Sequence, residues 1–112
     1  MRKECCIAWS KGFLVGAIGM DSAGDEIEII AQSYMENSPL LIYCDFVKDM
    51  SVVTTRKTRL IDTSGRQLFR IDTERKHELD AGAQIKIAGT ISKYVPLVDA
   101  IVISDYNKGL IT

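Results

Sequence analysis

The sequence predicts an α/β fold with a small β-sheet that projects from it. Two short apolar segments, residues 13–19 and 98–104, have the composition of buried strands. Two segments with helical periodicity begin near Ser22 and near Asp80, and a charged, strand-like region lies between them. Because these strands and helices alternate, we expect a parallel layer of strands packed against helices.

The first strand and helix have clear boundaries. "FLVGAIG", residues 13–19, is short, apolar and bounded by glycine. Ser22 is followed three residues later by Asp25, a spacing that resembles a capping box. One apolar helix face follows, made of Ile27, Ile30, Ala31, Tyr34 and Met35. We expect the helix to end at Asn37-Ser38-Pro39.

Residues 40–73 predict a β insertion of three strands. Its candidate strands are "LLIYCDFV" (40–47), "VVTTRKTRLID" (52–62) and "QLFRID" (67–72). Ser64-Gly65 can supply a two-residue turn between the last two, which would make them a hairpin.

The last part of the chain predicts a helix and a final strand. The helix begins near Asp80, and its apolar face is formed by Ile87, Ala88, Ile91, Tyr94 and Val95. Pro96 ends it, and "VDAIVIS" (98–104) reads as a strand that is apolar on both faces. Two core strands alone leave unprotected sheet edges, so we expect this chain to be a piece of a larger domain.

The composition argues against several classes of protein. The net charge of −1 over 112 residues does not suit a nucleic-acid partner. No apolar run has the length of a membrane span, so we expect no membrane partner. Cys5, Cys6 and Cys44 with a single histidine, His77, do not have the spacing of a metal site, and three free thiols favour the cytoplasm. The sequence also lacks the glycine-rich motifs of dinucleotide-binding folds and P-loop ATPases.

The predicted hairpin collects charge on one face. A turn at Ser64-Gly65 sets Lys57 opposite Asp72 and Arg59 opposite Arg70, which puts these four side chains on the same face. The other face is formed by Thr58, Leu60, Phe69 and Ile71. Opposed arginines repel each other, and a bound phosphate would offset that cost. The alternative is a solvated face with Lys57–Asp72 and Arg70–Glu74 ion pairs.

A second candidate site follows the last predicted strand. Ligands of open α/β sheets bind beyond the carboxyl ends of the strands, where "SDYNKG" (104–109) lies. Lys108 could meet a phosphate, and Asp105 could bind a sugar hydroxyl or orient a cation. The alternative is a polar loop that ends at Gly109.

Three segments together resemble the ribokinase-like (PfkB) carbohydrate kinases. They are "VGAIGMDSAGDEI", "VTTRKTRLIDTSGRQLFRIDTE" and "VDAIVISDYNKGLIT", and the closest similarity is to the D-glycero-β-D-manno-heptose 7-phosphate kinase domain. The resemblance covers about residues 13–112, whereas residues 1–12 do not resemble the family. It implies a partial three-layer α/β/α sandwich over residues 1–112, with residues 40–73 as a β-sheet lid.

The resemblance also implies a reaction. Such kinases use ATP and Mg²⁺ to convert D-glycero-D-manno-heptose 7-phosphate into the 1,7-bisphosphate, a step toward ADP-heptose and lipopolysaccharide. The sugar phosphate would be held by lid residues and by residues at the sheet crest, namely Lys57, Arg59, Arg70, Asp72, Asp105 and Lys108. A homodimer through the lid is expected.

The sequence departs from the family at the catalytic segments. The sugar-binding aspartate of the first strand, the GGA-N segment, the Asn-x-x-Glu segment and the GAGD motif are missing from the 112 residues. We therefore assign no catalytic residue, and we expect a fragment that is inactive alone. Two alternatives remain: a non-catalytic lid or dimerisation module, and a kinase of the same family for another sugar.

Overall fold

A computed structural model describes residues 11–38, 41–74 and 78–111. Its elements are β1 (Lys11–Gly19), α1 (Ser22–Asn37), β2 (Leu41–Asp49), β3 (Arg56–Ile61), β4 (Gln67–Thr73), α2 (Ala81–Tyr94) and the short 3₁₀ helix η1 (Val95–Leu97). The predicted mixed α/β class is confirmed. The atypical segment 1–12 lies almost wholly outside the described residues.

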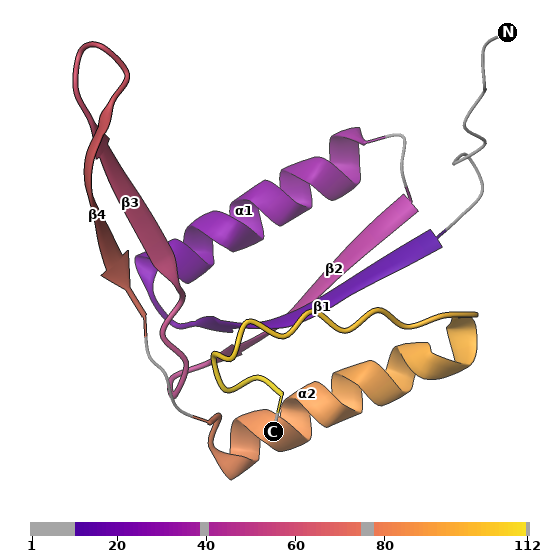
Figure 1. Ribbon diagram of the computed structural model, residues 1–112. Coiled ribbons are helices and arrows are strands. Elements are labelled where there is room, and N and C mark those ends of the chain that lie inside the picture. Colours follow the sequence, from indigo (N-terminus) through magenta and orange to yellow (C-terminus); the bar gives the residue numbers. More distant parts are fainter. Residues whose placement is uncertain (1–10, 39–40, 75–77, 112) are drawn as a thin grey trace, which may run out of the picture.

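The body of the molecule is a parallel pair of strands between two helices. β1 and β2 pair in register from Lys11↔Leu41 to Gly19↔Asp49. α1 connects them, and Figure 1 shows α1 and α2 on opposite sides of the pair. A buried cluster formed by Val47, Leu79, Ala83 and Ile87 joins β2 to α2. Of the apolar face predicted for the second helix, Ile87 is buried as expected, but Ile91 and Val95 are exposed, and the second buried residue of α2 is Ala83.

The first helix begins slightly differently from the prediction. Its N-cap is Asp21, not Ser22, because the Asp21 side chain accepts a hydrogen bond from the Gly24 amide at 2.8 Å. Ala31 is buried on the predicted apolar face, but Ile30 and Tyr34 are exposed. A sheet of two strands is too narrow to cover the whole face of a sixteen-residue helix.

The predicted three-stranded insertion over residues 40–73 is wrong. Its first strand, β2, makes its backbone hydrogen bonds with β1 and belongs to the body. Only β3 and β4 form the projecting sheet, and Figure 1 shows them rising from the body as one long hairpin. The projecting sheet is thus a two-stranded hairpin.

The strand register of the hairpin is confirmed, but its turn is not the predicted one. Lys57 pairs with Asp72 and Arg59 with Arg70, as expected. The loop has three residues, closed by a hydrogen bond from the Asp62 amide to the Arg66 carbonyl at 2.9 Å, with Gly65 in the left-handed region at φ 83°. A register shift next to Leu60 compensates for the extra loop residue and restores the predicted pairs.

The predicted final strand, residues 98–104, does not form. The segment makes no strand ladder in the described structure, and Ile101, Val102 and Ile103 are 60%, 93% and 70% exposed. A strand requires a neighbour that completes its backbone hydrogen bonds, and β1 pairs only with β2 here. Figure 1 shows the segment running along the body as an irregular chain.

No helix among the described residues is both long and apolar enough to cross a membrane.

Candidate anion-binding site

A cavity of about 420 Å³ lies where the foot of the hairpin meets the body and the C-terminal segment. Its apolar wall is formed by Ala17, Ile18, Ile27, Val52, Val53, Leu79 and Leu110. Its polar lining is contributed by Ser51, Thr54, Thr55, Lys57, Ser104, Asp105, Tyr106 and Lys108. A hydrogen bond from the Leu79 amide to the Gly109 carbonyl (3.2 Å) holds the C-terminal segment against the start of α2.

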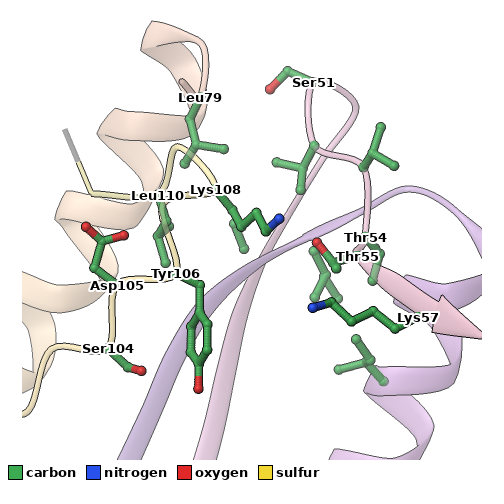
Figure 2. Close-up of a pocket in the computed structure, with 15 residues that line it drawn as sticks. Ser51, Thr54, Thr55, Lys57, Leu79, Ser104, Asp105, Tyr106, Lys108 and Leu110 are labelled. Atoms are coloured by element: carbon green, nitrogen blue, oxygen red, sulfur yellow. The ribbon is translucent and has the colours of Figure 1, made fainter. Parts of the chain in front are cut away.

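Two lysines reach this cavity from segments that are far apart in the sequence. Figure 2 shows Lys57 of β3 and Lys108 of the C-terminal segment extending toward each other from opposite walls. Lys57 makes no ion pair with any residue that the structure describes. Lys108 forms an ion pair with Glu74, directly after β4, and both side chains are largely shielded from solvent. Within the described part of the chain, the cavity therefore presents one cation without a counter-ion, Lys57, and one that shares its charge with Glu74, Lys108.

Asp105 lines the cavity, but its carboxylate forms a hydrogen bond within its own loop. Its carboxylate accepts a hydrogen bond from the Asn107 amide at 2.7 Å, and Asn107 has a left-handed backbone with φ 54°. Figure 2 shows the carboxylate turned away from the two lysines. In this arrangement Asp105 shapes the loop that carries Lys108.

The other predicted site residues lie outside the cavity lining. Arg70 forms an ion pair with Asp72 on the hairpin, with the two atoms 2.8 Å apart, and Arg59 has no ion-pair partner among the described residues. The structure thus brings three of the six predicted residues to one cavity, namely Lys57, Asp105 and Lys108. The solvated-face alternative expected the ion pairs Lys57–Asp72 and Arg70–Glu74. In the structure, Asp72 pairs with Arg70 and Glu74 pairs with Lys108.

Two polar residues beside the cavity were not predicted as site residues. Thr54, only 5% exposed, accepts a hydrogen bond from the Gly19 amide through Oγ1 at 2.8 Å. Its own amide donates to Asp21 Oδ2 at 2.9 Å, and this bond is the main reason why the pKa of Asp21 lies below its ordinary value. The glycines of "GMDSAG" are the sequence signal that could have revealed this contact. A side chain at Gly19 would collide with Asp21 and with the Val52 carbonyl.

No group of three or more metal-binding side chains occurs in residues 11–38, 41–74 and 78–111.

The chain is similar in sequence to curated proteins with one shared name. It is 32% identical over 103 residues to the bifunctional protein HldE of Helicobacter pylori, a match that covers 91% of this chain. The HldE proteins of Hyphomonas neptunium and a Bradyrhizobium species are 35% and 30% identical over 88% and 92% of it. The chain spans only about a fifth of each relative, 21%, 19% and 20% in the same order. No family model and no solved structure matches.

Proposed function

We propose that this chain, a relative of one segment of the HldE proteins, supplies the part of a carbohydrate kinase that holds a sugar phosphate. The resemblance found in the sequence points to D-glycero-D-manno-heptose 7-phosphate as the sugar phosphate. One observation carries the proposal: Lys57 and Lys108 converge on a single cavity from the hairpin and from the C-terminal segment.

The chemistry of the cavity suits a phosphate at one end of a sugar. Two ammonium groups can donate several hydrogen bonds to the phosphate oxygens. The wall formed by Ile18, Val52 and Leu110 lowers the local dielectric constant, which strengthens the attraction between the lysines and the phosphate. Hydroxyl groups of Thr55 and Ser104 on the lining are available to the sugar hydroxyls.

We do not assign phosphoryl transfer to these 112 residues. The family reaction needs ATP, Mg²⁺, a base and an anion hole for the developing charge, and the printed sequence contains no GAGD segment. We propose binding without turnover for this chain alone, in the cytoplasm.

The test is calorimetric titration of the purified chain with the heptose 7-phosphate and with the unphosphorylated heptose. We expect binding of the phosphate only. Lys57→Ala should weaken it about tenfold or more, because a hydrogen bond between charged groups is lost. Arg59→Ala is the matched control, since this neighbouring cation lies on the same hairpin face but outside the cavity lining.

Two outcomes would change the proposal. If Arg59→Ala weakens binding as much as Lys57→Ala, the phosphate lies on the charged hairpin face rather than in the cavity. If neither sugar binds, the proposed function is wrong. A tighter fit for another sugar phosphate would instead favour a kinase of the same family with a different substrate.

A dimerisation module is the second candidate, and a specific surface favours it. Leu60, Phe69 and Ile71 lie on the hairpin face opposite Lys57 and Arg59 and are 38%, 53% and 51% exposed. Apolar side chains on a single hairpin need cover, which the same face of a second copy could supply. We expect light scattering to detect a dimer that Phe69→Lys converts to a monomer. A monomer of the unaltered chain at high concentration would count against it.

A further inference from the structure

We infer that Asp21 and Thr54 are positioning residues that hold the foot of the hairpin so that Lys57 points into the cavity. The inference rests on the proposed binding of a sugar phosphate there. We assign neither residue a direct role in binding the ligand. Both act on Lys57 through the segment that leads into β3.

Asp21 and Thr54 tie three segments together at one point. The Thr54 hydroxyl accepts from the Gly19 amide at the end of β1, and the Thr54 amide donates to Asp21 Oδ2. The other oxygen of the same carboxylate, Oδ1, accepts from the Gly24 amide in the first turn of α1. β3 begins two residues after Thr54, and Lys57 is its second residue. A shift at Thr54 is therefore transmitted to Lys57 over only three residues.

The contact of Thr54 with Gly19 and Asp21 is buried, so it favours one backbone geometry. Thr54 is 5% exposed, and its hydroxyl group accepts the amide hydrogen bond in a buried setting. The surrounding backbone is packed so closely that a Cβ at Gly24 would collide with the Gly19 carbonyl. A buried amide that loses its acceptor costs more than an exposed one, so the contact favours one geometry strongly.

Val52, two residues before Thr54, packs against the core cluster, but the strands of the hairpin do not. Every residue of β3 and β4 is exposed, so no buried side chain on either strand ties the hairpin to the body. Outside the Asp21–Thr54 contact, the foot of β3 is held by the exposed ion pair between Arg56 and Glu26, at 2.8 Å. Exposed ion pairs contribute little on their own. At the foot of β4, a shielded ion pair joins Glu74 to Lys108. The start of β3, which carries Lys57, thus depends chiefly on Asp21 and Thr54.

Asp21→Asn separates the two roles of this side chain. Asparagine is a good N-cap, so its oxygen can still accept from Gly24 and preserve α1. The amide group then replaces Oδ2 and places donors against the Thr54 N–H, which removes the bond to the hairpin segment. Asp80→Asn is the matched control. Asp80 caps α2 through the Ala83 amide in the same way, and it lies outside the cavity lining.

Thr54→Val and Thr54→Ser form a second pair of variants. Valine keeps the shape and removes the acceptor for the Gly19 amide, whereas serine keeps the hydroxyl group. If the hairpin then samples other directions, apparent affinity falls in proportion to the fraction with Lys57 in place. We expect Asp21→Asn and Thr54→Val to weaken binding of the heptose 7-phosphate about tenfold, and Thr54→Ser and Asp80→Asn to change it less than twofold.

A second readout does not need the ligand. An amine-reactive cross-linker, followed by mass spectrometry, reports how often Lys57 and Lys108 face each other. We expect the Lys57–Lys108 product in the unaltered chain, a several-fold lower yield in Asp21→Asn and Thr54→Val, and an unchanged yield in the two controls. Circular dichroism at the same temperature confirms that each variant is folded.

The two readouts distinguish the failures. Unchanged cross-linking in folded Asp21→Asn and Thr54→Val would overturn the positioning role, whatever the ligand does. Reduced cross-linking in these variants, with no binding of the sugar phosphate even by the unaltered chain, would keep the positioning role and overturn the proposed function.

Discussion

The body and the hairpin of this molecule are stabilised by different interactions. The body buries Val47, Leu79, Ala83 and Ile87 between β2 and α2, whereas every residue of β3 and β4 is exposed. Figure 1 shows the hairpin projecting away from the body. Apolar packing thus determines whether the body folds, and a few polar contacts determine where the hairpin points.

The largest expected effect is the loss of stability when a buried isoleucine of α2, rather than an exposed one, is replaced by alanine. Ile87→Ala removes a side chain that is 8% exposed, and Ile85→Ala removes the same side chain where it is 72% exposed. We expect Ile87→Ala to lower the free energy of unfolding by about 2–4 kcal/mol, from lost burial and the cavity left behind. Ile85→Ala should change it by less than about 0.5 kcal/mol. Urea denaturation followed by circular dichroism measures both, and equal losses would mean that the cluster around Ile87 is not the core.

Local patterns predicted some of this comparison from the sequence. Apolar spacing identified one buried residue of α2, Ile87, but not Ala83, and the predicted pairing of Lys57 with Asp72 holds because a register shift beside Leu60 offsets the longer loop. These features depend on neighbours in the chain. The parallel pairing of β2 with β1 depends on which strand is nearest in space, and a run such as "LLIYCDFV" fits either sheet.

The site was predicted in part for the same reason. Lys57 was predicted because it lies on a charged strand, and Lys108 because it follows a predicted strand. The sequence around each lysine does not show that the two share a cavity. Thr54 carries no charge and matches no motif, so its buried contacts with Gly19 and Asp21 could not be read from spacing. The final strand was over-predicted because apolar composition does not supply a pairing partner.

The second prediction concerns pH and the polar contacts of the body. Asp49 accepts from Lys86 at 2.7 Å and from the Ser51 amide and hydroxyl, and these bonds lower its pKa from 3.8 to about 2. Because the folded pKa lies below the unfolded one, the stabilisation is complete above the unfolded pKa and is lost as pH falls toward the folded pKa. We expect Asp49→Asn to be less stable at neutral pH and to lose less stability on acidification.

A carboxylate on the hairpin is the control for this pH dependence. The Arg66 amide is the main reason why the pKa of Asp62 is also lowered, but Asp62 lies at the hairpin tip. We expect acid titration of Asp62→Asn, monitored by thermal unfolding of the body, to match the unaltered chain. A change as large as that of Asp49→Asn would show that the hairpin and the body unfold as one unit.

The third prediction tests the foot of β4. Glu74 neutralises part of the charge that Lys108 presents to the cavity. Glu74→Gln keeps the size of the side chain and removes its charge, so Lys108 should attract an anion more strongly. We expect affinity for the heptose 7-phosphate to rise a few-fold at low salt, and the gain to shrink as salt is added. A weaker affinity would instead mean that Glu74 holds Lys108 in the orientation that binding requires.

The smallest expected effect is at the tip of the hairpin, where the comparison with the body is sharpest. Gly65 has φ 83°, and no atom lies within 4 Å of the Cβ that an alanine would add, so Gly65→Ala introduces backbone strain without a collision. A left-handed backbone at a residue with a side chain costs about 1 kcal/mol. Because no buried side chain couples the hairpin to the core, this cost should fall on the hairpin alone. We expect faster amide hydrogen exchange in β3 and β4, with the urea midpoint of the body unchanged.

Gly89→Ala in α2 is the control, because a Cβ there also meets open space. This variant should raise the urea midpoint of the body slightly, because alanine favours a helix. A lower midpoint for Gly65→Ala would show that strain at the tip reaches the core, and that the hairpin contributes to the stability of the body.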